Sequence, residues 1–419
     1  MYTKILFHSI TILSILISSI RTWPEPLVLK EYVLASNYFG FNLLGKKCQE
    51  NERSSLSKAK ENVFLSPFSI ATVMAMIQQG AMSDTFNQLN FVLGFQLARI
   101  DSDKHLLAKQ IRTSLNQINS IDLNESNSLK IANALVVGKN FPIKQEFNET
   151  IRKNFDSELL EVDFVGENDL AMAIINQWCS DKTMGKINQF LQNPPSPATQ
   201  LIAINAIYFK GVWKNRFASN QTEIGKFYGC NNQIFENVSF MRRQGRIVYA
   251  YLAELQSDLV ELPYEGDEVS WFGILPRDRS EIDLNLIRKA LNPWYIEAAI
   301  SRLNEENEST IILPRLKVVG RYDLKETLKD MGLINVFDRK KADLSGINDQ
   351  EQVIVDDIRH AAIMDINEEG TEAAASTYVG FVKMSLQPST VFNFNRPFIL
   401  FIRHNPTGLI LFLGEINKP

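Results

Sequence analysis

The chain changes character at Leu201, after which β-strand patterns follow one another at short spacing. Runs rich in β-branched and aromatic residues cover 201–208, 259–263, 270–275, 310–316, 353–366, 398–403 and 409–415. The last two runs are joined by Asn405-Pro406-Thr407-Gly408, a composition typical of a turn. Short connections join antiparallel strands, so this half predicts large, mainly antiparallel sheets.

Helical patterns dominate the first half of the chain. Apolar residues recur with helical spacing over 25–44, 70–80, 104–118 and 170–186, and strands are predicted near 61–65 and over 129–137. Pro67 suits a first helical turn, and Ser66 suits the N-cap before it. Helices early and strands late predict an α+β fold, and no repeat or linker divides the chain into further domains.

The N-terminus predicts export from the cell. Lys4 precedes a mostly apolar run, Ile5–Ile20, which is typical of a secretory signal peptide, with a buried N-terminal helix as the alternative. We expect a signal over residues 1–22, cleaved between Ser19 and Trp23, and one domain over 23–419 in an extracellular protein. No later stretch is long and apolar enough to span a membrane.

Glycosylation sequons agree with secretion, and the cysteines exclude a disulfide scaffold. Five Asn-x-Ser/Thr triplets make the protein a candidate glycoprotein, and they begin at Asn124, Asn148, Asn220, Asn237 and Asn307. The three cysteines, Cys48, Cys179 and Cys230, allow at most one pair, and we favour free buried thiols. Their spacing excludes a CxxC metal or redox motif.

The sequence lacks the motifs of common enzymes. It contains four histidines and no GxSxG, HExxH or GxxxxGK[ST] motif. We therefore expect neither catalysis nor a metal or other cofactor. The net charge of −4 gives no basic field that would attract nucleic acid.

Several segments resemble signature stretches of the serpin family, in order from about residue 28 to the C-terminus. The segments are Asn62–Ile70, Ile175–Trp178, Thr183–Ile187, Asn205–Trp213, Glu261–Tyr264, Leu313–Arg315, Ala342–Ile347, Asn367–Ala375 and Asn395–Phe398. The resemblance implies a monomeric domain of three β-sheets and about nine helices with an exposed reactive loop, here about 368–390. It also implies suicide inhibition, in which a serine protease cleaves the loop, stays esterified to it and is displaced as the loop inserts into the main sheet.

The reactive loop has the pattern of a strand that can enter a sheet. The resemblance makes Glu368, Glu369, Gly370, Thr371, Glu372, Ala373, Ala374 and Ala375 the hinge. Alternate side chains face opposite sides of a strand. The face that begins with Thr371 is uncharged up to Phe381, and no proline follows Gly370 before Met384, so every backbone N–H can join a ladder. A non-inhibitory serpin, used as a carrier or chaperone, is the alternative, and we expect it to carry charge or proline on this face.

The family register places the cleaved bond between Met384 and Ser385, fourteen residues after Gly370. Met384 suits the apolar pocket of a chymotrypsin- or elastase-like protease. A shift by one residue would make Lys383 the bait for a trypsin-like protease.

The resemblance also assigns roles to residues outside the loop. Five residues resemble the polar cluster and tryptophan where the main sheet opens, namely Ser66, Ser69, Asn205, His360 and Trp213. Lys104, His105, Lys109 and Arg112 lie on the helix where some serpins bind heparin, a glycosaminoglycan, but we favour a solvated helix face as the explanation of these four residues.

Overall fold

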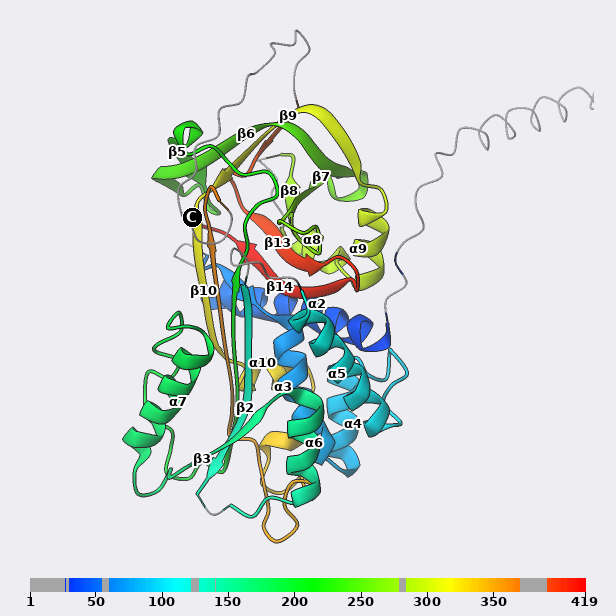
Figure 1. Ribbon diagram of the computed structural model, residues 1–419, viewed down its shortest axis with the longest axis vertical. Coiled ribbons are helices and arrows are strands. Elements are labelled where there is room, and N and C mark those ends of the chain that lie inside the picture. Colours follow the sequence, from blue (N-terminus) through cyan, green and yellow to red (C-terminus); the bar gives the residue numbers. More distant parts are fainter. Residues whose placement is uncertain are drawn as a thin grey trace, which may run out of the picture.

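The fold combines two β-sheets with helices packed around them, as the computed structural model shows (Figure 1). The structure describes residues 27, 30–54, 60–121, 128–139, 141–278, 284–369 and 390–419. The described residues contain nine α-helices, which confirms the predicted α+β class.

The five-stranded sheet contains a parallel strand pair near its centre, flanked by antiparallel pairs. Its order is β10 (Leu316–Asp323), β11 (Asp357–Ile366), β4 (Leu201–Lys210), β2 (Ser128–Gly138) and β3 (Glu158–Val162). β11 is antiparallel to β10, and β4 is antiparallel to β2, but β11 and β4 run parallel. Their pairing extends from Asp357 opposite Ile202 to Ile363 opposite Tyr208. We call this parallel pair the seam.

The nine-stranded sheet joins two of the predicted sheets into one hydrogen-bonded network, because the 19-residue strand β6 runs through both. Its order is β1 (Val63–Leu65), β14 (Leu409–Ile416), β13 (Phe398–His404), β8 (Val269–Pro276), β7 (Ser257–Pro263), β6 (Ile234–Leu252), β9 (Asn304–Pro314) and β12 (Thr390–Asn393), with β5 (Glu223–Tyr228) beside β6.

Helices cover the two faces of the five-stranded sheet unequally. The nine helices are α2 (Glu31–Ser54), α3 (Pro67–Gly80), α4 (Ser83–Val92), α5 (Lys104–Asn119), α6 (Gln145–Phe155), α7 (Asn168–Lys182), α8 (Leu284–Ala290), α9 (Pro293–Ile300) and α10 (Lys325–Asp330). α3 packs against β4 and β2 inside the main core, whereas α7 lies on the opposite face over a small separate cluster (Figure 1). The sheet is therefore buried on both sides.

Most predicted elements are present, with shifts at their ends. The helix predicted over 25–44 is α2, which begins at Glu31, and the strand predicted over 353–366 begins at Asp357. Before Asp357 the backbone N–H groups bond outside the β10–β11 ladder. Val355 N–H donates to the Val336 carbonyl, and Asp356 N–H donates to the Leu201 carbonyl. The patterns did not reveal the helices α4, α6, α8, α9 and α10. All five have eleven or fewer residues, so each shows few repeats of the helical apolar spacing.

Candidate functional site

A buried polar cluster lies directly behind the seam. His360 on β11 and Asn205 on β4 are register partners, and His360 Nδ1 lies 2.5 Å from Asn205 Oδ1. The Ser66 N–H donates to His360 Nε2 over 3.1 Å, and Asn205 Nδ2 donates to Asn133 Oδ1 over 2.5 Å. One hydrogen-bonded chain therefore ties the N-cap of α3 to β11, β4 and β2.

These bonds fix the protonation state of His360. Because Nε2 accepts from Ser66, the ring proton lies on Nδ1 and points to Asn205. Burial lowers the pKa of His360 to about 3, so the ring is neutral at physiological pH. A second proton would place an N–H against the Ser66 N–H and break the link to α3.

The top of the seam holds the start of the reactive segment. Trp213 donates its backbone N–H to the Glu369 carbonyl over 2.7 Å and its indole N–H to the Asn367 carbonyl over 2.9 Å. The Phe217 N–H donates to the Glu368 carbonyl over 2.8 Å. The Trp213 ring is buried and stacks on Tyr264, with centroids 4.5 Å apart. This rigid aromatic pair anchors residues 367–369, which we call the hinge base.

The Glu368 side chain provides a second anchor for the hinge base. The two oxygens of its buried carboxylate share the Arg315 Nε–H, at 2.8 and 2.9 Å from the nitrogen, and one of them also accepts from Arg315 Nη2 at 2.5 Å and from the Thr222 hydroxyl. Burial alone would raise the pKa of Glu368, but the bonds from Arg315 and Thr222 outweigh it and hold the pKa below its ordinary value. The charge of Glu368 is therefore satisfied only while the hinge base stays in place.

The structure brings together the predicted residues that it describes. Ser66, Asn205 and His360 form the cluster, and Ser69 bonds to Ser66 through its N–H at 3.3 Å. Trp213 donates to the carbonyl of Glu369, and Phe217 donates to that of Glu368. The remaining predicted loop residues lie outside the described residues, namely Gly370, Thr371, Glu372, Ala373, Ala374, Ala375, Lys383, Met384 and Ser385.

Sequence reasoning missed three members of this site. Asn133, Thr222 and Arg315 all bond to predicted residues. Arg315 belongs to the Leu313-Pro314-Arg315 segment, so its motif was visible although its partner was not. Asn133 interrupts the apolar strand β2 with one buried polar side chain, which is the signal that could have revealed it.

Two of the predicted glycosylation positions are well exposed. Asn220 lies in a short 3₁₀ turn, and Asn237 projects from β6 at a left-handed backbone position with φ of 61°. Asn148 is half-buried in α6 with its Oδ1 enclosed. Asn124 and the Asn307 side chain lie outside the described part.

The three cysteines are unpaired. Cys48 and Cys179 are buried and Cys230 is half-buried, and burial raises the pKa of each thiol. These thiols are therefore protonated and poorly nucleophilic.

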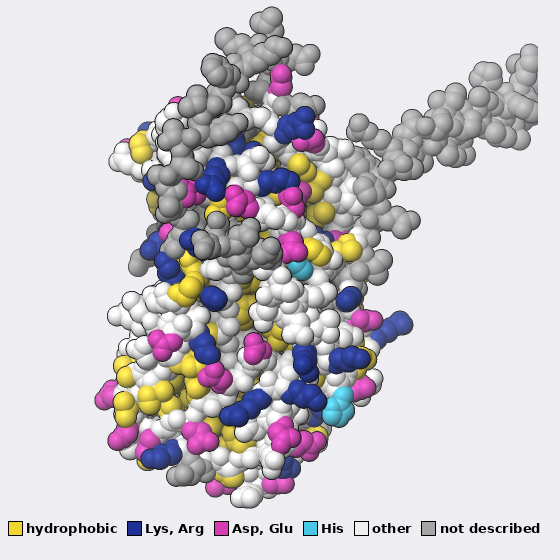
Figure 2. Space-filling view, viewed as in Figure 1, with side chains coloured by type: hydrophobic (Ala, Val, Ile, Leu, Met, Phe, Trp, Pro, Cys, Tyr) yellow, Lys and Arg dark blue, Asp and Glu magenta, His cyan; other side chains and the backbone are white. Residues whose placement is uncertain are grey.

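Only part of the predicted basic face of α5 is free. The Lys104 ammonium donates to the carbonyls of Gln79 and Ala81, at 2.9 and 2.7 Å, and thus caps α3. His105, Lys109 and Arg112 are exposed with a spacing that places them on one stripe of α5. Figure 2 shows Lys and Arg side chains gathered over the region where α5 lies in Figure 1.

Among the helices that the structure describes, none has the length and apolar character needed to cross a bilayer.

The fold and this site define a class of protein. A parallel seam lies against a buried polar cluster, and the hinge base is held at its upper end. The family model described as Serpin (serine protease inhibitor) matches residues 34–419. The chain therefore belongs to the serpin family.

Relatives and solved structures agree. Iripin-8 of Ixodes ricinus is 36% identical over 391 residues, covering 91% of this chain and 92% of its own. Antithrombin-III of Homo sapiens is 34% identical, covering 86% and 77%. The structure of mouse protein-Z dependent protease inhibitor superposes with a TM-score of 0.81 at 24% identity, covering 93% and 97%. Thyroxine-binding globulin complexed with thyroxine also reaches 0.81 at 24% identity, covering 92% and 99%.

Proposed function

We propose that this chain is a secreted suicide inhibitor of a chymotrypsin- or elastase-like serine protease. The observation that carries the proposal is the seam: a parallel strand pair, between antiparallel neighbours, whose upper end holds the hinge base through Trp213 and Arg315. Parallel pairing is slightly less stable per residue than antiparallel pairing. A strand entering antiparallel to both β4 and β11 would replace the parallel ladder with two antiparallel ladders.

The chemistry begins at the reactive bond between Met384 and Ser385. The protease serine hydroxyl attacks the Met384 carbonyl, the bond to the Ser385 nitrogen breaks, and that nitrogen takes up the proton. The new Met384 ester joins inhibitor to protease. If residues 371–384 then enter the seam, the esterified protease is carried about 45 Å, at about 3.3 Å per residue.

The energy of insertion is sufficient to distort the captured protease. The inserted strand has 14 residues and two edges to pair. At about 1 kcal/mol net per hydrogen bond, the gain is on the order of 10 kcal/mol or more. A protease domain is stable by only about 5–15 kcal/mol, so distortion of its active site could precede ester hydrolysis.

We further propose the surroundings in which the inhibitor works. The signal over residues 1–22 directs the domain 23–419 to the extracellular space as a monomer, with glycans at Asn220 and Asn237 rather than at the enclosed Asn148. A glycosaminoglycan would contact His105, Lys109 and Arg112, since Lys104 is occupied as a helix cap.

Incubation with a panel of serine proteases tests the proposal. We expect a complex that survives boiling in detergent, together with a C-terminal peptide that begins at Ser385 by mass spectrometry. A peptide that begins at Met384 would make Lys383 the bait residue, with a trypsin-like target. Met384→Arg should redirect inhibition toward trypsin-like proteases, because the primary specificity pocket of the protease binds that side chain and selects it by charge and shape.

A non-inhibitory role is the rival function, and thyroxine-binding globulin shows that the same fold accompanies ligand binding. Such a chain would form no covalent complex with any protease of the panel. It would also melt at the same temperature before and after loop cleavage.

A further inference from the structure

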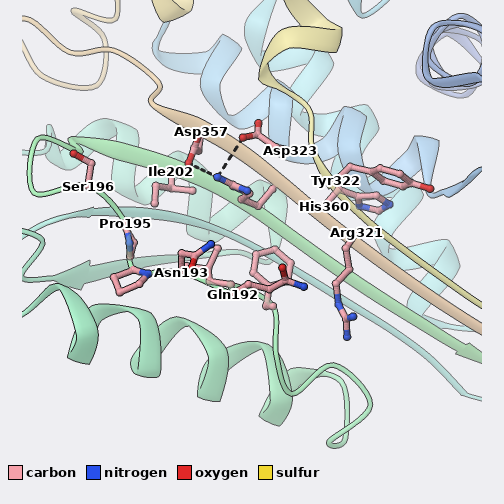
Figure 3. Close-up of a pocket in the computed structure, with 14 residues that line it drawn as sticks. Gln192, Asn193, Pro195, Ser196, Ile202, Arg321, Tyr322, Asp323, Asp357 and His360 are labelled. Atoms are coloured by element: carbon pink, nitrogen blue, oxygen red, sulfur yellow. Dashed lines mark hydrogen bonds and ion pairs between the residues drawn. The ribbon is translucent and has the colours of Figure 1, made fainter. Parts of the chain in front are cut away.

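A polar cavity of about 350 Å³ lies over the lower end of the seam. Its walls are the segment 190–196, which leads from α7 to β4, and the outer faces of β10 and β11 (Figure 3). Ile202 on β4 and Asp357 on β11 both line it, and these two residues are register partners across the seam. A molecule in the cavity would therefore touch both strands that must separate when a new strand enters.

The loop wall of the cavity is held in place by hydrogen bonds. The Asn176 amide donates to the Leu191 carbonyl over 3.0 Å and accepts from the Leu191 N–H over 2.7 Å, which ties the loop to α7. Pro194 and Pro195 restrict the backbone that follows, and Pro195 is buried. A cavity with such a wall is preformed, so a ligand would not have to order it.

Several polar groups face the cavity without partners. Arg321 is exposed on β10 and has no hydrogen bond or ion pair to any described residue, and Figure 3 shows its side chain extending from the strand toward the side where the loop lies. Gln192 and Asn193 likewise make no side-chain hydrogen bond within the described part. The Nε atom of Arg359 is buried and unpartnered. Such groups favour a ligand that can accept hydrogen bonds.

Negative charge lies at the other end of the cavity. Asp323 and Asp357 both pair with one nitrogen of Arg359, at 3.2 and 2.8 Å, and their remaining oxygen positions can accept further bonds. Asp323 and Arg321 are two residues apart on β10, so the strand rise separates their Cα atoms by about 7 Å, and in Figure 3 the Arg321 side chain extends away from Asp323. Within the described part of the chain, the cavity is thus lined by an unpaired cation and by two carboxylates that share Arg359.

We propose that this cavity binds a small zwitterion of the ω-amino acid type, with its carboxylate on Arg321 and its ammonium group on Asp323 and Asp357. A ligand with both charges complements both ends, whereas a simple anion would face the two aspartates and a simple cation would face Arg321. The inference extends the proposed function, because a ligand that bridges the loop, β4 and β11 stabilises the closed seam. Bound zwitterion would therefore slow strand insertion.

Calorimetric titration of the intact chain with three matched probes tests the site. The probes are 6-aminohexanoate, hexanoate and hexan-1-amine, which share a six-carbon chain and differ only in their charged ends. We expect 6-aminohexanoate to bind at least about tenfold more tightly than either other probe, since each loses one of two charge contacts. Equal binding of hexanoate, or no binding of 6-aminohexanoate, would overturn the proposal.

Variants on one strand locate the binding. Arg321→Gln should weaken 6-aminohexanoate binding about tenfold and leave it no better than hexan-1-amine. Lys317→Gln is the matched control, because Lys317 is exposed on the same face of β10 but does not line the cavity. Unchanged affinity in Arg321→Gln, or an equal loss in Lys317→Gln, would place the ligand elsewhere and refute the assignment.

The regulatory consequence is tested separately. With 6-aminohexanoate present, more inhibitor should be consumed per protease inactivated, and this increase should vanish in Arg321→Gln. Binding without any such increase would refute the proposal that the bound ligand stabilises the closed seam. Should no protease be trapped at all, the proposed function fails, while the titrations still decide whether the site exists.

Discussion

The strand pairs β13–β14 and β4–β11 are both central and buried, yet they differ in how they are held. β13 and β14 are antiparallel and buried along their whole length, and large apolar side chains are register partners across the pair, with Phe401 opposite Leu413 and Phe412 opposite Ile402. The β4–β11 seam is parallel and places Asn205 against His360 at its centre.

This difference indicates which pair can open. Separating β13 from β14 would expose the buried apolar side chains that are partners across the pair, which is costly because the hydrophobic effect scales with apolar area. Separating β4 from β11 mainly exchanges hydrogen bonds, and an entering strand can restore many of them at about 1 kcal/mol each. On its outer face beneath α7, the seam carries the small side chains of Ala206 and Ala361 together with Ile202, Ile204 and Ile363.

The largest effect is expected from Thr371→Arg, a variant meant to prevent strand entry at the seam. The arginine would face the core on the inserted strand, where an unpaired charge costs several kcal/mol. The number of inhibitor molecules consumed per protease should rise about tenfold or more, because the ester hydrolyses first. Glu372→Arg faces outward and should largely preserve inhibition. Equal inhibition by wild type and Thr371→Arg would exclude strand insertion.

Phe401→Ala probes the antiparallel pair and should cost about 3–5 kcal/mol of unfolding free energy, through lost burial and a cavity beside Phe272. Ser69→Ala is the counterpart behind the seam, equally buried but with an unpartnered hydroxyl, and should change stability by less than about 0.5 kcal/mol. Denaturant titration of both variants decides the comparison. A loss at Ser69 as large as that at Phe401 would contradict it.

Acid should weaken both regions through buried histidines. Burial lowers the pKa of His360 to about 3 and that of His404, on β13, to about 4. Because the unfolded chain takes up these protons first, the stability from each neutral ring is complete above pH 6.5 and is lost as the pH falls toward the folded pKa. At pH 5 each histidine should cost about 2 kcal/mol.

His360→Gln and His404→Gln separate the two contributions. Each variant should lose less stability than wild type between pH 7 and 5, measured by denaturant titration. The difference from wild type isolates the histidine from Glu261 and Glu297, since burial raises the pKa of both carboxyls and acts in the opposite direction. A His360→Gln profile that parallels wild type would show that the ring is not neutral and buried at the seam.

The smallest effect is expected at two matched ion pairs. Arg315 and Arg277 are each about half exposed, and they pair with the buried carboxylates of Glu368 at the hinge base and Asp258 on β7. Solvent screening limits either arginine-to-alanine change to about 1 kcal/mol of unfolding free energy. Only Arg315→Ala should also alter the rate at which the covalent complex with the protease forms, measured by quenching the reaction at successive times. An equal change in Arg277→Ala would mean that the hinge base has no special role.

Local patterns were sufficient for much of the fold. The apolar spacing over 104–118 predicted α5, and Ser66 before Pro67 predicted the start of α3, because caps and helical periods depend on a few neighbouring residues. The signature segments also pointed to Asn205, His360 and Trp213, which lie at the seam and at the hinge base in the structure.

The sequence alone determined the fold class, the family resemblance and the alternating character of the segment after Gly370, since each depends on residue type and order. Only the tertiary structure decided the partners: Asn133 for Asn205, Arg315 for Glu368, and a helix-capping role for Lys104 instead of a free charge. It also placed Arg321, which has no partner among the described residues, in a cavity beside the seam. Hydrogen bonds and ion pairs act over a few ångströms, so they join residues that the chain separates by dozens of positions and that no local pattern can match.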